Sequence, residues 1–143
     1  MRKTAQFLLL VAVMTTVVTA CDNQSPSGTV SAVFDCAINK DYDKMTEYIL
    51  FDTQDEGELK ERQIQAASIY RAAYEEIKHT VGAIEKVTVT GEQIAPDGKT
   101  ATVSFKVKYV NGDEDPGEQT LINHEGRWYY PDPLQPKSET LAL

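Results

Sequence analysis

Two periodicities divide this chain. Between residue 29 and about residue 80, apolar side chains recur at intervals of three and four residues, which predicts amphipathic helices. After Gly82 the interval falls to two and β-branched residues become frequent, which predicts strands. Helices followed by an antiparallel run of strands predict an α+β domain whose helices pack on one face of the sheet.

The helical half is expected to contain three helices. The first starts at Pro26 and Ser27, and its apolar stripe consists of Val30, Val33, Phe34, Ala37 and Ile38. Asp41 can cap a second, shorter helix, whose shared face consists of Met45, Tyr48 and Ile49. The third is expected over about residues 58–80, with an inward face of Leu59, Gln63 or Ile64, Ala66, Ala67, Tyr70, Ala73, Tyr74 and Ile77.

The second half predicts at least four antiparallel strands. The first begins at Ile84, and a turn at residues 95–99 leads into a strand over residues 100–109. Its inward face would be Ala101, Val103, Phe105, Val107 and Tyr109, and its outward face Thr100, Thr102, Ser104, Lys106 and Lys108. Residues 111–118 are expected to be a second turn, followed by strands over residues 119–124 and 128–130.

The N-terminal residues have the order of an export signal. Arg2 and Lys3 precede the apolar residues 7–14, and the small residues 18–20 lead directly to Cys21. This pattern resembles the lipobox of bacterial lipoproteins. The resemblance implies a signal peptide over residues 1–20, a covalent lipid on Cys21 and an anchor in the bacterial cell membrane. Asp22 also resembles the signal that keeps enterobacterial lipoproteins in the inner membrane.

Two alternatives for this segment fit less well. A membrane-spanning helix needs about 20 apolar residues, whereas residues 5–20 are fewer and include Gln6 and three threonines. An ordinary secretory signal would not require a cysteine after residues 18–20. The expected organisation is therefore a flexible tether at residues 21–28, one domain at residues 29–131 and a loose tail at residues 132–143.

Charge limits the partners of the mature chain. The 143-residue chain carries a net charge of -8, and loss of Arg2 and Lys3 with the signal makes the remainder more acidic still. An acidic domain is repelled by nucleic acid and by anionic headgroups. We therefore expect no nucleic-acid partner, and contact with the membrane through the lipid on Cys21 rather than through a basic patch.

The second cysteine, Cys36, has no partner within the mature chain if Cys21 is acylated. It lies beside apolar helical positions, which favours a buried small hydrophobic residue. A reactive thiol and a disulfide to another protein remain open alternatives.

Two stretches resemble nuclear transport factor 2-like domains. Residues 28–50 contain an apolar helix, the turn Asn39-Lys40-Asp41-Tyr42 and a second short helix, and residues 123–129 (NHEGRWY) look like the closing hairpin of these domains. The resemblance implies a curved antiparallel sheet wrapped around helices to form a cone with a pocket. Some members of the wider fold are isomerases, cyclases or dehydratases, and many only bind or dimerise.

Aromatic residues are the candidates for lining such a pocket: Phe34, Tyr48, Tyr70, Tyr74, Phe105, Tyr109 and Trp128. An enzyme of this kind would need a general base and acid in the cone, but the inward face of residues 100–109 has no carboxylate. His79 and His124 lie near element ends and are expected to face solvent. No catalytic residue is predicted.

The sequence also predicts no cofactor and no metal. Residues 111–117 space their oxygen ligands as a calcium loop does, but Pro116 takes the place of the required glycine and Ile122 that of the final glutamate. A solvated acidic turn is the better interpretation. No Cys/His cluster suggests zinc, and no glycine-rich loop suggests a nucleotide.

The sequence as a whole predicts a lipid-anchored envelope protein with a non-catalytic domain. This domain would bind a small apolar ligand or a protein partner. An isomerase- or cyclase-like enzyme that uses the cone is one alternative. A homodimer through the outward sheet face is another, although the polar side chains there favour a monomer.

Overall fold

The computed structural model describes residues 23–135. They form the helices α2 (Pro26–Ile38), α3 (Tyr42–Met45) and α4 (Glu56–Thr80), the short 3-10 helix η1 (Thr46–Tyr48), and the strands β1 (Ile49–Leu50), β2 (Ile84–Ile94), β3 (Thr100–Tyr109), β4 (Glu114–His124) and β5 (Arg127–Pro131). The predicted α+β class is confirmed. The predicted signal peptide, Cys21 and residues 136–143 lie outside the described residues.

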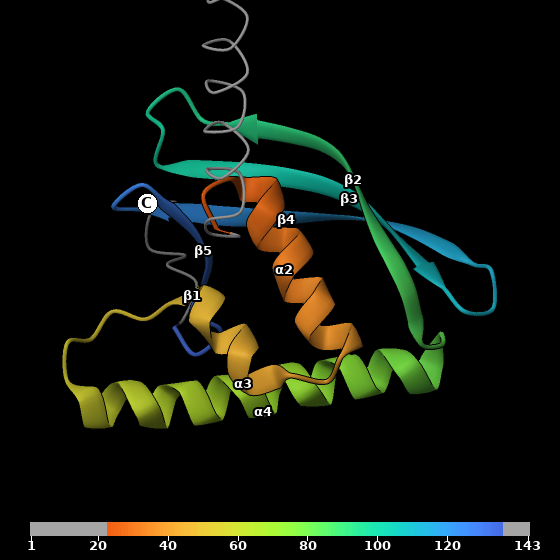
Figure 1. Ribbon diagram of the computed structural model, residues 1–143, viewed down its shortest axis with the longest axis horizontal. Coiled ribbons are helices and arrows are strands. Elements are labelled where there is room, and N and C mark those ends of the chain that lie inside the picture. The colour runs from red at the N-terminus through yellow and green to blue at the C-terminus, as the bar shows by residue number, and fades with distance from the viewer. Residues whose placement is uncertain (1–22, 136–143) are drawn as a thin grey trace, which may run out of the picture.

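The five strands form one open, mixed sheet in the order β1-β5-β4-β3-β2. Strands β2 to β5 pair antiparallel, as predicted, whereas β1 pairs parallel with β5 through Ile49 and Tyr130. The sequence placed Ile49 on a helix face, because a two-residue strand is too short to have a readable period. In Figure 1 the long strands β2 to β4 twist strongly, α2 lies against the sheet, and α4 runs across the far end of α2.

Strand β4 is longer than predicted. It begins at Glu114, so the predicted turn over residues 111–118 is a turn of residues 110–113 only. Pro116 is compatible with the strand because β5 pairs only with residues 122–124 of β4 and leaves the edge beside Pro116 unpaired. Charged side chains at Glu114, Asp115 and Glu118 keep this open edge from pairing with another chain.

The predicted alternation along β3 is confirmed. Its inward residues are all buried, namely Ala101, Val103, Phe105, Val107 and Tyr109. They face α2, where Val30 and Val33 are completely buried. Burial of apolar surface between α2 and the sheet is therefore the main source of stability, at about 25 cal/mol per Å².

Helix α4 is covered along a narrower stripe than predicted. Ala66 and Ala67 are buried, and Tyr70, Tyr74 and Ile77 pack against the core, but Ala73 is exposed. Between the two alternatives for the inward face, Gln63 is half-buried and Ile64 is 62% exposed. The stripe is narrow because α4 packs mainly on α3 and η1 instead of on the broad face of the sheet.

Both ends of the domain are fixed more firmly than predicted. Ser25 caps α2, and the Glu92 carboxylate accepts hydrogen bonds from Ser27 N–H (2.9 Å) and Oγ (2.8 Å), which places negative charge at the helix N-terminus. The Asn23 carbonyl accepts a 2.9 Å bond from Trp128 N–H. The ordered domain thus includes residues 23–28, assigned above to the tether, and Asp132, assigned to the tail, is only 6% exposed.

A glycine in β4 makes room for the central aromatic ring. Gly117 pairs with Phe105 across the strands, and a Cβ built at Gly117 would lie 2.5 Å from Phe105 Cε2. The ring therefore covers the glycine backbone, and no larger residue fits there unless the ring moves.

Gly117→Ala should lower the free energy of unfolding by about 1–3 kcal/mol, because the new methyl overpacks the core against Phe105. Gly91→Ala is the matched control: its Cβ would meet only Ser104 Cβ, at 3.9 Å. The control should be neutral or more stable by about 0.5–1 kcal/mol. Urea denaturation of both variants measures the difference, and equal stabilities would contradict the predicted clash.

Candidate functional site

The structure brings together three of the seven aromatic residues proposed to line a pocket. The Phe34 ring contacts Phe105 edge-on with 5.0 Å between centroids, and Tyr74 packs against Phe34 at 6.3 Å. Tyr42, not among the candidates, adds a ring 6.3 Å from Tyr74. These rings belong to the continuous core or pack directly on it, so they fill the space between α2, α4 and the sheet.

Of the other four candidates, Tyr70 lies close enough to Tyr74 to help raise its pKa, and the remaining three lie elsewhere. Trp128 is 5% exposed and lies beside the start of α2, where its carbonyl accepts a 2.9 Å bond from Thr29 Oγ1. Tyr109 is at the opposite end of the sheet, paired with Ile84, and Tyr48 is on η1. Tyr70 packs on the core from α4. The seven residues thus extend along the whole core and do not surround one chamber.

Three interior tyrosines have phenols that are hard to ionise. Burial, and secondarily the negative charge of Asp132, raises the pKa of Tyr70 to about 12. Burial raises the pKa of Tyr74 and of Tyr130 further above the ordinary value, with a smaller effect from neighbouring tyrosines. All three phenols are protonated at neutral pH, and none is suited to act as a general base there.

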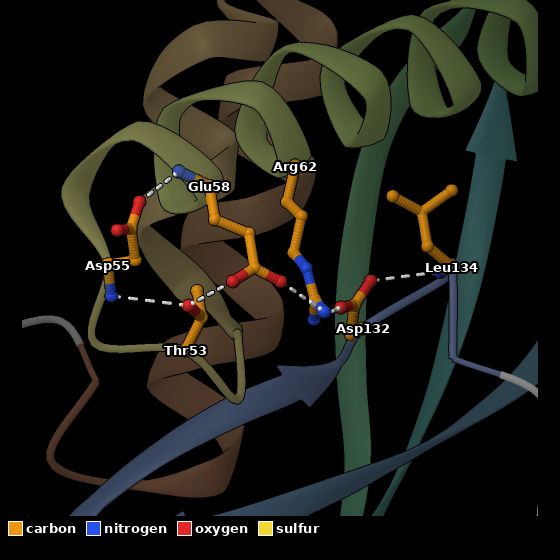
Figure 2. Close-up of polar contacts among 6 residues, drawn as sticks. All are labelled: Thr53, Asp55, Glu58, Arg62, Asp132 and Leu134. Carbon is orange, nitrogen blue, oxygen red and sulfur yellow. Dashed lines mark hydrogen bonds and ion pairs between the residues drawn. The ribbon is translucent and has the colours of Figure 1, made fainter.

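A second feature is the polar cluster at the start of α4, drawn in Figure 2. The Asp132 side chain is completely buried; its Oδ1 accepts a 2.9 Å bond from Leu134 N–H, and its Oδ2 lies 3.4 Å from Arg62 Nη1. Arg62 also pairs with Glu58 at 2.7 Å, and Thr53 Oγ1 donates to Glu58 at 2.8 Å.

This cluster joins distant parts of the chain. Through it, the segment after β5 is held to α4, and the Asp132 charge has a cation and a backbone donor as partners. Removing Arg62 would leave the buried charge of Asp132 without its cation, which is destabilising. Within residues 23–135, no buried side-chain nitrogen or oxygen lacks a hydrogen-bond partner. The arrangement is therefore that of a structural network, complete without a ligand.

A surface groove of about 300 Å³ lies between α2 and the α3–η1 segment. Its lining consists of Gly28, Ser31, Ala32, Asp35, Cys36, Asn39, Asp41, Lys44 and Tyr48. The sequence analysis singled out Asp41 as a helix cap, which it is, since its Oδ1 accepts from Lys44 N–H. It did not select Ser31, Asp35 or Lys44. The sequence feature that could have identified Ser31 and Asp35 is their four-residue spacing, which marks the polar side of α2.

Cys36 lies on the inner side of this groove. It is 6% exposed, which confirms the predicted buried residue, and it is a free thiol. Burial raises the pKa of the Cys36 thiol, and the nearby Lys44 charge only partly opposes this effect. A protonated thiol is a poor nucleophile. The contacts that the groove can make therefore depend on its charged side chains, Asp35, Asp41 and Lys44.

The histidines take no part in either feature. Both are exposed, as predicted, and His124 lies beside a turn with its ring 6.5 Å from Tyr129. Asn111 donates to the Val81 carbonyl and to Asp113, so its side chain organises the acidic turn. In the described part of the chain, no group of three or more His, Cys, Asp or Glu residues is arranged to hold a metal ion.

The sequence profile of a domain of unknown function, DUF4878, matches residues 19–130. The chain belongs to the DUF4878 family. No curated protein sequence matches this DUF4878 chain. Among its described helices, none is both long and apolar enough to span a bilayer.

Two solved structures share the fold of this DUF4878 domain. One is a Campylobacter jejuni protein provisionally described as an NTF2-like transpeptidase, with 14% identity, a TM-score of 0.52, and coverage of 74% of this chain and 96% of that one. The other is a SEC-C motif containing protein from Rhodopseudomonas palustris, with 19% identity, a TM-score of 0.50, and coverage of 80% and 81%. At these identities the likeness shows the NTF2-like fold alone.

The buried phenols predict alkaline unfolding. The pKa of Tyr70 is about 12 in the folded protein and about 10 in the unfolded chain, so both states are protonated below pH 10. Between pH 10 and 12 the unfolded chain releases this proton and the folded one retains it. The free energy of unfolding should fall by up to about 1.4 kcal/mol per pH unit for each such tyrosine.

Phenolate absorbance and circular dichroism, followed together through a pH titration, test this prediction. The absorbance of the interior tyrosines should rise only as the fold is lost, and Tyr70→Phe should make the loss of stability less steep. Ionisation of all seven tyrosines in the folded protein would contradict it.

Proposed function

We propose that this DUF4878 domain is held at the bacterial cell envelope by a lipid on Cys21 and binds a protein partner, without catalysis, through the groove between α2 and α3. The single observation that carries the non-catalytic proposal is the packing of Phe34, Tyr74 and Phe105 in the space where a reaction chamber would be. The lipobox-like residues 18–21 support the anchor.

The interior lacks the groups that an isomerase- or cyclase-like reaction requires. Such a reaction needs a base that is ionised near neutral pH and within reach of substrate. The buried phenols stay protonated, and the buried carboxylate of Asp132 is bound to Arg62 and to Leu134 N–H. These contacts argue against the enzyme alternative.

The groove suits a protein partner better than a small apolar ligand. Sites for small molecules are usually concave, enclosed and mostly apolar, whereas this groove is open and carries Asp35, Asp41 and Lys44. Charged groups on both sides of a surface groove instead favour polar contacts with another chain. A small apolar ligand is the weaker candidate because the interior is filled.

The anchor is tested by Cys21→Ser. The wild-type protein should incorporate labelled palmitate and fractionate with membranes, and the variant should lose both properties, because the thioether cannot form on serine. Cys36→Ser is the matched control and should keep the label and the membrane location. Palmitate on the Cys21 variant would refute the anchor.

The groove is tested with a photo-crosslinking amino acid at Ser31 in intact cells. Ser31 lines the groove and is exposed, whereas Ser68, the control position, is exposed on α4. We expect a specific adduct from position 31 and none from position 68. Lys44→Glu should weaken this adduct because it replaces the positive charge of Lys44 by a third negative charge beside Asp35 and Asp41. A crosslink to a second copy would make that copy the partner in the groove, in place of a dimer through the outward sheet face. An apolar molecule co-purifying with the protein would favour the small-ligand alternative.

A further inference from the structure

One end of the sheet lies next to the proposed lipid site. The turn at residues 95–99, the turn at residues 125–126 and residues 23–25 meet there, and we call this region the anchor-side rim. Backbone bonds tie it together: Trp128 N–H donates to the Asn23 carbonyl (2.9 Å), and Asn123 N–H to the Lys99 carbonyl (2.8 Å). Figure 1 shows the β2–β3 turn and the start of α2 on the same side of the molecule, opposite the β3–β4 turn.

The chain between the lipid and this rim is very short. Only Asp22 separates Cys21 from Asn23, so even a fully extended chain allows about 7 Å between their Cα atoms. The headgroup layer of a bilayer is itself roughly 5–8 Å thick on each side. With a lipid on Cys21, Asn23 therefore lies within the headgroup layer or at its outer surface.

We propose that the anchor-side rim is a docking surface for the lipid headgroups of the membrane that holds the protein. This inference rests on the proposed lipidation of Cys21. The domain would then sit directly on the bilayer in a fixed orientation, instead of moving freely on a flexible tether.

The charges of the molecule fit this orientation. Lys99, in the first rim turn, and Arg127, at the start of β5, balance Asp97 and Glu125. Glu92, at the same end, keeps its negative charge, and its carboxylate faces Ser27 at the N-terminus of α2. At the opposite end, the β3–β4 turn and the start of β4 carry Asp113, Glu114 and Asp115, and Lys86 and Lys108 lie next to them in the sheet. Anionic headgroups would repel this acidic turn more strongly than the two rim turns.

The rim also offers an apolar contact. Ile94 is 48% exposed at the last position of β2, immediately before the turn that carries Lys99. An exposed isoleucine beside lysine and arginine is a combination suited to the interface, where the apolar side chain enters the headgroup region and the cations meet lipid phosphates.

The test places a fluorescent dye at single cysteines in the lipidated full-length protein with Cys36→Ala. The dye is attached at Pro96→Cys, an exposed position of the rim that carries no charge, or at Val110→Cys on the opposite end, where Val110 is 65% exposed. The protein is reconstituted in phosphatidylethanolamine–phosphatidylglycerol vesicles containing a lipid with a nitroxide on its headgroup. We expect strong quenching of the dye at position 96 and background quenching at position 110.

A second variant tests whether the quenching depends on the side chains of the anchor-side rim or only on the short chain between Cys21 and Asn23. Ile94→Asp combined with Arg127→Glu, with the dye still at position 96, should lose most of the quenching while circular dichroism shows an intact fold. Quenching that is unchanged in this variant, or equal at positions 96 and 110, would overturn the docking surface. A protein that carries no lipid and does not enter the vesicles would instead refute the anchor of the proposed function, so the two failures are distinguishable.

Discussion

The contact of Phe34 with Phe105 is the interaction on which the rest of this domain depends. It presses α2 onto the sheet, and it is possible only because β4 presents Gly117 beneath the Phe105 ring. Tyr74 extends the contact to α4, which otherwise rests on α3 and η1. The Phe34–Phe105 pair thus connects α2 with the sheet, and Tyr74 connects this pair with α4.

The same packing limits the chemistry of the interior. Aromatic rings fill the centre, the phenols at its margin are protonated, and the buried carboxylate of Asp132 is paired. The polar side chains that remain available lie on the surface between α2 and α3, and the position next to the proposed lipid lies at the start of α2. Both features that suggest a function are therefore at the surface, one along α2 and the other beside its first residue.

Regular patterns in the sequence were sufficient for most of the fold. The alternation along residues 100–109 and the cap at Asp41 predicted β3 and α3 correctly, since both depend on local periodicity and local hydrogen bonds. Strand β1 and the early start of β4 could not be predicted in this way, because pairing with distant strands decides them: Ile49 pairs with Tyr130, and Pro116 with Lys106. The groove escaped detection for the same reason, since Ser31 and Lys44 meet only after α3 folds back on α2.

The order in which the chain is made has a consequence for assembly. The Asn23 carbonyl accepts a hydrogen bond from Trp128 N–H, and β1 pairs with β5. Segments from the two ends of the described chain therefore pair with each other. Contacts between residues so far apart in sequence form late and slow the folding of a domain. A chain threaded through a membrane from its N-terminus, as the proposed anchor would require, cannot complete this sheet until β5 has crossed. The domain therefore closes only after its last strand arrives.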